Sequence, residues 1–224
     1  MLRRTKADRA AKLPPKIELN ISVGLTAMQM KVYQELLQSN SLLDSSNSNS
    51  TSYHNLLMQL RKACNHPYNF QGIEEENAGN GEHLATNCGK MIFLEKLLQK
   101  CMAQKEQIIL FSGFTMMLSI IEDYLTWREI PYCRLDGSTE LAERESQIED
   151  FTSPNSDKVI FLISTRAGGL GINLVSANHV VLYDSDFNPQ VDLQAMDRAH
   201  RIGQHKTVYV YRLVTKDTVE EKIV

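Results

Sequence analysis

The sequence predicts an α/β fold built on a parallel sheet with helices on both faces, preceded by an α-rich segment. From residue 87 onward, short apolar runs alternate with stretches of helical periodicity. Runs such as 107–112 and 159–164 are apolar almost throughout, which is typical of strands that are buried on both faces. Before residue 87 the chain instead carries helical patterns separated by polar, low-complexity stretches. We therefore divide the chain into an N-terminal segment over 1–86 and a sheet domain over 87–224.

The N-terminal segment is predicted to contain one strand, two helices and two loops. The strand alternates apolar and polar side chains after Pro14 and Pro15, and Thr26 is a plausible N-cap for the first helix. A Ser/Asn-rich stretch between the helices predicts a flexible loop, and a Gly/Glu/Asn-rich stretch after them predicts another. The bounds are 16–23 for the strand, 26–38 and 53–64 for the helices, and about 40–52 and 71–82 for the loops.

The sheet domain is predicted to alternate strands and helices to the end of the chain. The strands are expected at 107–112, 132–135, 159–164, 179–183 and 208–214. The helices are expected at 90–104, 116–127, 141–151 and 190–200, followed by a last helix capped by Thr218. Ligands of such sheets bind at the carboxyl ends of the strands, so the loops that follow the strands are the candidate functional loops.

Composition restricts the class of protein. The 224 residues, 42% hydrophobic and 23% charged, suit one soluble globular domain. A net charge of −3 differs from the basic character of a self-sufficient DNA-binding module, so any nucleic-acid contact must come from local clusters. No apolar run approaches the ~20 residues that span a bilayer. No secretory signal follows the charged N-terminus, which leaves the cytosol or nucleus.

The four cysteines indicate neither disulfides nor a metal centre. They are scattered without a CxxC spacing, which favours structural thiols in a reducing compartment. Cys64 and His66 could form half of a metal site, but no second pair has a useful spacing. We therefore predict no metal ligands in this chain.

A glycine-rich loop follows the predicted strand 159–164. The string Gly168-Gly169-Leu170-Gly171 would let backbone amides approach an anion closely. It matches neither the GxGxxG dinucleotide pattern nor the GxxxxGK[ST] P-loop, and no such P-loop occurs elsewhere in the chain. A plain tight turn is the alternative interpretation.

Two arginines are the second candidate. On the predicted helix 190–200 and its continuation, Arg198 and Arg201 are three residues apart and Gln194 is four residues before Arg198, so they would share one face. Two guanidinium groups aimed in one direction suit phosphate oxygens. Ion pairing with Asp192 or Asp197 is the alternative.

Two further strand-to-helix turns carry polar side chains. Asp184 and Asp186 follow the predicted strand 179–183 and could bind a metal or a ribose, or simply form a turn before Pro189. The stretch 134–139 could hold a phosphate at a helix N-terminus, or provide an ordinary N-cap. No Ser-His-Asp set is visible.

Together these loops resemble a known set of motifs. STRAGGLGINL (164–174), YDSDFNPQ (183–190) and DLQAMDRAHRIGQ (192–204) are similar to motifs V, Va and VI of helicase superfamily two. With LMQLRKACNHPY (57–68), the chain resembles the Swi/Snf-type chromatin-remodelling ATPases over nearly its whole length, and the ISWI type most.

The resemblance implies the C-terminal, RecA-like lobe of a two-lobed ATPase. The P-loop, the catalytic carboxylates and the magnesium would belong to the other lobe. Arg198 and Arg201 would be arginine fingers on the γ-phosphate of ATP, and Gln194 would support them. Gly169, Gly171, Asn173 and Asp184 would lie near the nucleotide. This lobe alone would then be inactive, although the whole protein would be a DNA-dependent ATPase.

The resemblance also implies DNA contacts and partners. Contacts to the phosphates and the strand would come from Ser112, Gly137, Ser138, Thr165, Arg166 and Phe187. Many relatives have Trp where Phe187 stands, so the aromatic surface is kept and the indole donor is lost. The partners would be double-stranded DNA, nucleosomes, the N-terminal lobe of the same protein and remodelling-complex subunits, in the nucleus. A strand-separating helicase lobe and a non-catalytic interaction module are the alternatives.

Overall fold

The computed structural model describes residues 13–43, 50–75, 79–167 and 171–223. Within them the sheet has six strands in the order β1-β6-β5-β2-β4-β3, and every neighbouring pair is parallel. The predicted parallel α/β fold is therefore confirmed. The strands are β1 (Lys16–Val23), β2 (Ile108–Ser112), β3 (Tyr132–Leu135), β4 (Ile160–Ser164), β5 (His179–Leu182) and β6 (Val208–Thr215).

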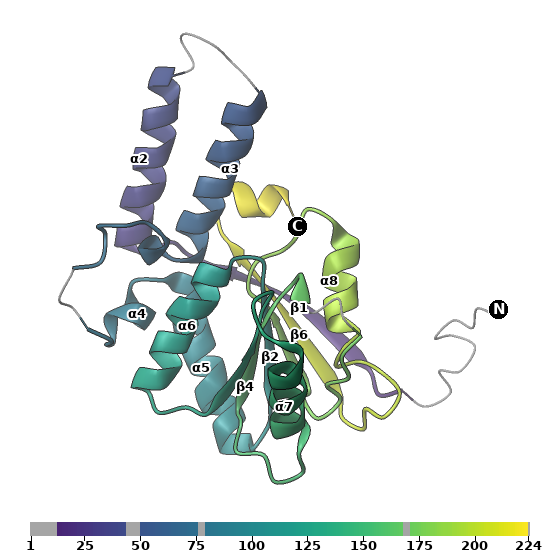
Figure 1. Ribbon diagram of the computed structural model, residues 1–224. Helices are drawn as coiled ribbons and strands as arrows, with labels where there is room; N and C mark the ends of the chain where they lie inside the picture. The colour runs from purple at the N-terminus through teal and green to yellow at the C-terminus, as the bar shows by residue number, and fades with distance from the viewer. Residues whose placement is uncertain (1–12, 44–49, 76–78, 168–170, 224) are drawn as a thin grey trace.

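Helices cover both faces of the sheet (Figure 1). Successive side chains of a strand point to opposite faces. Ile108 and Leu110 of β2 accordingly pack with α4, α5 and α6, whereas Ile109 and Phe111 pack with α7 and α8. This two-sided burial explains why the central strands read as continuous apolar runs. The helices are α4 (His83–Thr86), α5 (Gly89–Gln104), α6 (Thr115–Trp127), α7 (Leu141–Thr152) and α8 (Pro189–Met196).

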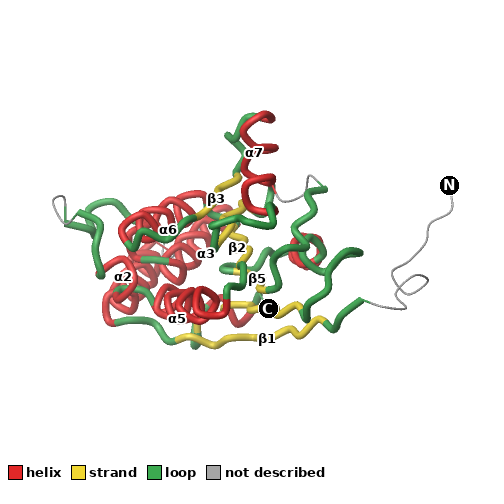
Figure 2. The backbone as a smooth tube through the Cα atoms, turned by 90° about the horizontal axis from the view of Figure 1, so that it is seen from below, coloured by secondary structure: helices red, strands yellow, loops and turns green. Residues whose placement is uncertain are grey.

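The N-terminal segment supplies one edge of this sheet. β1 pairs with β6 over its whole length, from Lys16 beside Val208 to Val23 beside Thr215. Figure 2 shows β1 along the edge opposite β3. All of its side chains are exposed or half-buried, as an edge strand allows, and burial follows the alternation of the sequence only over 20–23. The division at residues 86 and 87 therefore separates two sequence segments that share one sheet.

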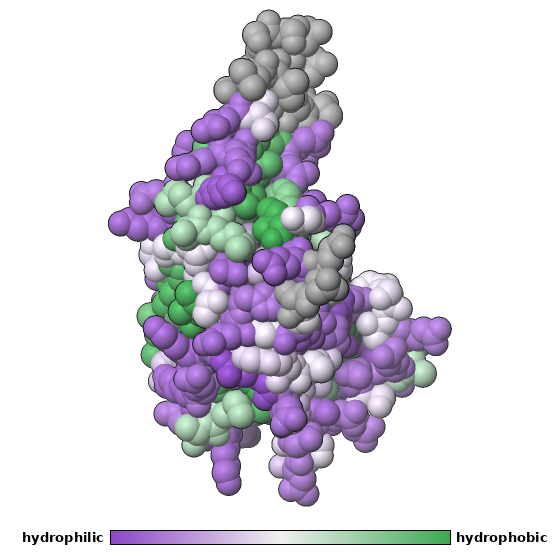
Figure 3. Space-filling model, turned by 90° about the vertical axis from the view of Figure 1, so that its left-hand side faces the viewer, coloured by the Kyte–Doolittle hydropathy of each residue, from purple (hydrophilic) through white to green (hydrophobic). Residues whose placement is uncertain are grey.

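Two antiparallel helices project from one end of the sheet (Figure 1). They are α2 (Ala27–Leu43) and α3 (Ser50–Asn65), and their shared core includes Val32, Leu60 and Cys64. Apolar side chains are gathered on this part of the surface below its grey tip, whereas the lower part of the same view is largely hydrophilic (Figure 3). The hairpin is the structural form of the predicted α-rich segment.

The predicted loop at about 40–52 is shorter in the structure. α2 continues to Leu43 and α3 already begins at Ser50, so both helices extend into that range. Residues 44–49 lie outside the described residues. Ser and Asn are only moderately poor helix formers, so a stretch that is rich in them does not exclude a helix.

The chain ends differently from the prediction. Thr218 accepts a hydrogen bond from the Glu220 amide at 3.2 Å, as a cap does, but the element that follows is a short 3-10 helix, η3 (Val219–Lys222). A second 3-10 helix, η1 (Pro67–Asn69), follows α3. No helix in the described ranges has the length and apolar character needed to cross a membrane.

Candidate functional site

The carboxyl edge of the sheet brings four of the predicted loops into one row. The strand order β5-β2-β4-β3 sets the loops at 183–188, 113–114, 165–167 and 136–139 next to one another. These loops contain most of the residues that the sequence predicted to contact DNA. Their order along the chain differs from their order in space, so only the sheet topology makes them neighbours.

A small cleft lies at the centre of this row. Its volume is about 240 Å³, and its lining includes Thr165, Arg166 and Phe187, three of the predicted DNA contacts. Arg166 and the ring of Phe187 are exposed, the latter at 49%, whereas Thr165 is buried. We call this the loop cleft; its other lining residues are His54, Met58, Arg61, Gly113, Phe114, Asp184 and Asp186.

Helix α3 forms one wall of the loop cleft, which the sequence analysis did not foresee. His54, Met58 and Arg61 recur at spacings of three and four residues, so they share one face of α3. The sequence signal was present, because Arg61 belongs to the LRKACNHPY string. No role could be assigned to it without knowing that α3 lies against the loop after β5.

Asp184 does not fit the predicted contact to a nucleotide. It is 2% exposed, and its carboxylate accepts hydrogen bonds from the Ser112 hydroxyl, the Gly113 amide at 2.8 Å and the Asn65 side chain at 3.3 Å. Burial raises its pKa, while Lys90 and the bonds from Ser112 and Gly113 act in the opposite direction. Asp184 is thus a structural acceptor at the base of the loop cleft, and its oxygens are already bonded within the protein.

Ser112 is closed in the same way. Its side chain is fully buried and donates to Asp184, so the predicted contact from this hydroxyl to a DNA phosphate is not supported. The neighbouring amides are also used internally: Gly113 donates to Asp184, and Thr165 donates to the Ser112 carbonyl at 3.0 Å. The groups left at the surface of the loop cleft are side chains, mainly Arg166 and Phe187.

The turn after β3 is closed on itself. The Asp136 carboxylate accepts from the Ser138 hydroxyl at 2.6 Å and the Ser138 amide at 2.9 Å, and these bonds lower its pKa. Arg134 pairs with the same carboxylate at 2.9 Å. α7 begins only at Leu141 and its N-cap position is Glu140, so the alternative of an N-cap at 136–139 is wrong, whereas the phosphate contact of this turn stays a prediction. Gly137 and Ser138 remain exposed.

The two predicted arginine fingers lie beyond helix α8. The helix ends at Met196, so the expectation of a helix to residue 200 is wrong. The next bonds are mixed: Arg198 to Ala195 at 3.1 Å and Ala199 to Met196 at 3.3 Å are of the tighter i to i−3 type, whereas His200 to Met196 at 3.2 Å is i to i−4. Gln194 is exposed in the last turn of α8, Arg201 is exposed and Arg198 is half-buried. We call residues 197–204 the arginine turn.

Contacts to the rest of the protein fix the arginine turn. The Gln204 side chain donates to the Ala177 carbonyl at 2.9 Å and to the Ala199 carbonyl at 3.2 Å. The Arg198 carbonyl accepts from the Leu174 amide at 3.1 Å. Tertiary bonds therefore hold the chain in place beyond the last regular turn of α8, although helical periodicity in the sequence predicted a longer helix.

The segment after the glycine loop lies against the arginine turn. The Leu174 bond to Arg198 brings Gly171 and Asn173 to this region, and both are exposed. Gly171 has a φ of 76°, a left-handed conformation that favours glycine. Gly169 lies outside the described residues. The structure thus joins two of the predicted nucleotide-binding strings.

Electrostatics at the arginine turn suit an anion. Burial lowers the pKa of Arg198, and the nearby charge of Arg201 lowers it further, while Asp197 raises it. The predicted alternative of a pair with Asp192 is wrong, because the Asp192 carboxylate bonds Arg212 of β6 instead. Two guanidinium groups that repel each other would each be stabilised by a shared phosphate.

The loop cleft and the arginine turn are connected through α8. Asp192 on α8 accepts from the Asp186 amide at 3.2 Å, and Arg212 bonds both Asp192 and the Ser185 hydroxyl, the latter at 2.9 Å. The loop that carries Phe187 is therefore tied to the helix that leads into the arginine turn. Hydrogen bonds of Asp192 and Arg212 thus form a continuous connection between the two sites.

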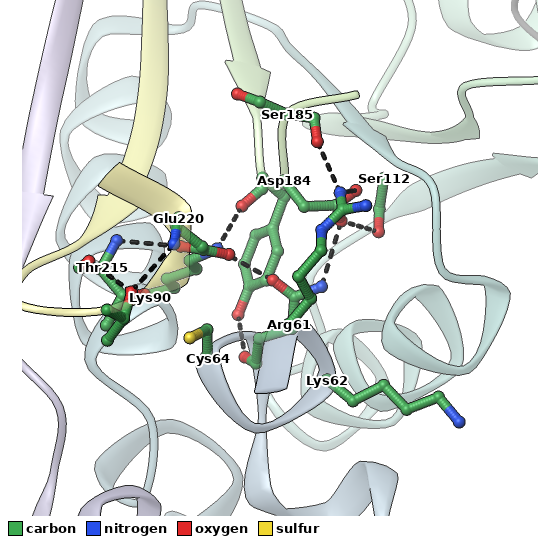
Figure 4. Close-up of polar contacts among 12 residues, drawn as sticks. Arg61, Lys62, Cys64, Lys90, Ser112, Asp184, Ser185, Thr215 and Glu220 are labelled. Atoms are coloured by element: carbon green, nitrogen blue, oxygen red, sulfur yellow. Dashed lines mark hydrogen bonds and ion pairs between the residues drawn. The ribbon is translucent and has the colours of Figure 1, made fainter. Parts of the chain in front are cut away.

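A buried polar cluster supports this arrangement from below (Figure 4). The fully buried ammonium group of Lys90 donates to the Asn65 side chain at 2.8 Å, the Tyr183 carbonyl at 2.8 Å and Glu220 at 2.7 Å. It joins α3, α5, the end of β5 and η3. Sequence analysis missed it, because a lysine in an amphipathic helix is normally solvated. Within the described ranges, no group of three or more His, Cys, Asp or Glu side chains could hold a metal ion.

Comparison with known families and structures gives two domain matches. Residues 89–203 match the helicase conserved C-terminal domain, and residues 1–69 match the SNF2-related domain. The C-terminal part of the Fun30 ATPase domain superposes with a TM-score of 0.82 at 32% identity, over 95% of this chain and 89% of that one. The Sulfolobus solfataricus SWI2/SNF2 ATPase core in complex with dsDNA gives a TM-score of 0.79 at 32% identity, over 99% of this chain and 46% of that one.

The whole chain is also similar to parts of longer proteins. The human SWI/SNF-related matrix-associated actin-dependent regulator of chromatin subfamily A member 1 is 55% identical over 227 residues. An ISWI chromatin-remodelling complex ATPase of Saccharomyces cerevisiae is 50% identical over 231 residues. All of this chain is covered in both cases, but it spans only 22% and 20% of those two proteins, about a fifth of their length.

Proposed function

We propose that the chain is the second lobe of a DNA-translocating ATPase, because it belongs to the helicase C-terminal domain family. Within that family it belongs to the SNF2-related chromatin-remodelling ATPases. Its fold is the RecA-like fold of SWI2/SNF2 ATPase cores. In our proposal this lobe completes an ATPase site whose P-loop and magnesium ligands belong to another lobe of the same polypeptide. It also contacts the duplex that the protein moves along.

The nucleotide side of the proposal rests on the arginine turn. Arg198 and Arg201 would face the γ-phosphate of ATP across the cleft between the lobes, with Gln194 beside them. Their mutual repulsion is relieved by an anion, and the charge that develops on the transferred phosphoryl group gives them their catalytic effect. Gly169, Gly171 and Asn173 would lie near the ribose and phosphates. ATP supplies the free energy; the magnesium that accompanies it would be held by the other lobe.

The DNA side rests on the loop cleft. Arg166 is exposed and makes no ion pair among the described residues, so it can neutralise a backbone phosphate. The Thr165 hydroxyl and the exposed Gly137 and Ser138 would contact neighbouring phosphates. Phe187 offers half of its ring surface to the strand. Contacts of this kind position a duplex without reading its sequence, which suits a motor that moves along any DNA.

The observation that carries the proposal is the link between the two sites. Asp192, on the helix that leads into the arginine turn, bonds the amide of Asp186, next to Phe187. Closure of the arginines on a nucleotide would therefore shift the loop that meets DNA. Alternate closing and opening would ratchet the protein along one strand, and the relatives' names support nucleosomes, remodelling-complex subunits and the nucleus as its setting.

The test is DNA-stimulated ATP hydrolysis by the two-lobe protein. Arg201→Ala is expected to reduce the stimulated rate about 10³–10⁵-fold while nucleotide binding is kept, because the arginine acts on the transition state. Lys206→Ala, which removes another exposed cation a few residues away, is the matched control and should keep the rate. The lobe alone should hydrolyse almost no ATP. Hydrolysis that responds neither to duplex DNA nor to Arg201 would refute the motor and favour an interaction module.

A further inference from the structure

Arg61 occupies an unusual position for a cation. It is 6% exposed, and its guanidinium carbon lies 4.7 Å from the ring centre of Phe187 and 5.3 Å from that of Phe114. One of its amino groups donates to the Ser185 carbonyl, two residues before Phe187. The nearest carboxylate oxygen, on Asp184, is 3.9 Å away and already accepts from other groups. Arg61 is thus held by two rings and a carbonyl more than by an ion pair. Figure 4 shows its side chain extending from α3 towards Ser185 and Asp184.

Phe187 has little else to fix its ring. Among the described residues it belongs to none of the three apolar clusters, and its one recorded ring contact is with Arg61. Its backbone segment is anchored just before the ring, where the Ser185 carbonyl accepts from Arg61 and the Asp186 amide donates to Asp192. A half-exposed aromatic ring without such a contact would sample several rotamers.

We infer that Arg61 is a positioning residue that holds the Phe187 ring at the loop cleft in the orientation that meets duplex DNA. The inference rests on the proposed DNA-binding function. It gives α3, a helix outside the sheet, the role of orienting the Phe187 ring. The planar guanidinium is suited to this role, because it can stack on a ring and donate within its plane to the Ser185 carbonyl at the same time. Through Arg61 the α2–α3 hairpin sets the angle at which the aromatic surface meets the strand.

The test measures duplex affinity by fluorescence anisotropy, over a series of salt concentrations, for the two-lobe protein. The variants are Arg61→Met, Phe187→Ala and the two combined. Lys62→Met is the matched control, since it removes a neighbouring positive charge from α3 that points away from the cluster (Figure 4). Arg61→Lys keeps the charge but loses the planar fork, and it guards against a folding defect of the methionine variant.

Arg61→Met is expected to weaken duplex binding about fivefold, the scale of a lost cation–π contact. It should weaken binding no further when Phe187→Ala is already present, because it acts through that ring. The slope of log affinity against log salt should stay as in the unsubstituted protein, and Lys62→Met should leave the affinity unchanged. Arg61→Lys should fall between the unsubstituted protein and Arg61→Met.

Two results would overturn the inference. The first is equal weakening by Arg61→Met in both backgrounds, or a salt slope reduced by about 0.9, since either would make Arg61 a phosphate contact or a general stabiliser. The second is full affinity in Arg61→Met although Phe187→Ala weakens binding. If the unsubstituted protein fails to bind duplex DNA at all, the proposed function fails instead. The fluorescence measurement described next still tests whether Arg61 holds the side chain at position 187.

The orientation of the ring can be followed directly. Trp127 is the one tryptophan of these 224 residues, so in this lobe Phe187→Trp in a Trp127→Phe background reports on position 187 alone. The same protein without Phe187→Trp gives the emission to subtract. Adding Arg61→Met should shift the emission of the introduced indole to the red and increase its quenching by acrylamide. Emission and quenching that do not change would show that Arg61 does not hold the side chain at position 187.

Discussion

Replacement of Lys90 by methionine is expected to reduce the free energy of unfolding by about 3–5 kcal/mol. The ammonium group has no exposed surface and makes three hydrogen bonds, at 2.7 to 2.8 Å, to Asn65, Tyr183 and Glu220. Methionine fills a similar volume but donates nothing. Glu220, which is 5% exposed, would be left as a buried carboxylate without its cation.

The magnitude follows from what remains after the substitution. Glu220 keeps one donor, the Thr215 amide at 2.9 Å, so part of its charge stays stabilised. The Asn65 and Tyr183 oxygens each lose a hydrogen bond that contributes about 1 kcal/mol. The range of about 3–5 kcal/mol for breaking a buried ion pair already includes these two losses. If the unpaired charge dominates the loss, Glu220→Gln in the Lys90→Met background should restore at least half of it.

Urea unfolding followed by circular dichroism measures these differences. Lys96→Met, on the exposed face of the same helix, is the matched control and should change the free energy by less than about 0.5 kcal/mol. A loss below about 1 kcal/mol for Lys90→Met would refute the reasoning, because water would then be reaching the site. Failure of Glu220→Gln to restore stability would assign the loss to packing instead of charge.

Two further predictions concern stability. Burial lowers the pKa of His66 to about 4, whereas the pKa of a histidine in the unfolded chain is near 6.5. As the pH falls from about 6.5 to about 4, the unfolded state therefore binds a proton that the folded state does not. The free energy of unfolding should decrease over this range. The fall should reach about 3 kcal/mol, and His66→Gln should flatten it in urea titrations at several pH values; an unchanged slope would contradict the assignment. A methyl group at Gly89 would lie 2.1 Å from the Gly24 carbonyl, so Gly89→Ala should cost about 1–3 kcal/mol by thermal unfolding. Gly137→Ala, with no atom within 4 Å, should cost little, and equal losses for the two variants would refute the steric argument.

Sequence periodicity was a reliable guide where burial was two-sided. The runs at 107–112 and 159–164 became β2 and β4 almost as predicted, because a strand covered on both faces must be apolar throughout. It failed at 197–204, where bonds of Gln204 and Leu174 hold a turn beyond the end of α8. It failed also at 40–52, where both helices extend into a stretch of polar composition.

The candidate site was predicted in part. The motif strings identified Thr165, Arg166, Phe187 and the two arginines as candidates, and the structure brings the first three to one cleft. Sequence could not tell that Ser112 and Asp184 are bonded to each other beneath that cleft, since a hydroxyl and a carboxylate read alike whether they face a ligand or one another. It gave no role to Arg61 either.

The sequence by itself determined the class of fold and the family, because both follow from local order: the alternation of apolar runs and the spacing of residues within short motifs. Only the tertiary structure decided which polar groups form hydrogen bonds within the protein and which remain at the surface. It also decided that β1 shares the sheet and that α3 carries Arg61 to Phe187. The last two facts depend on contacts between residues more than a hundred positions apart, and no local pattern encodes the partner of a side chain across that distance.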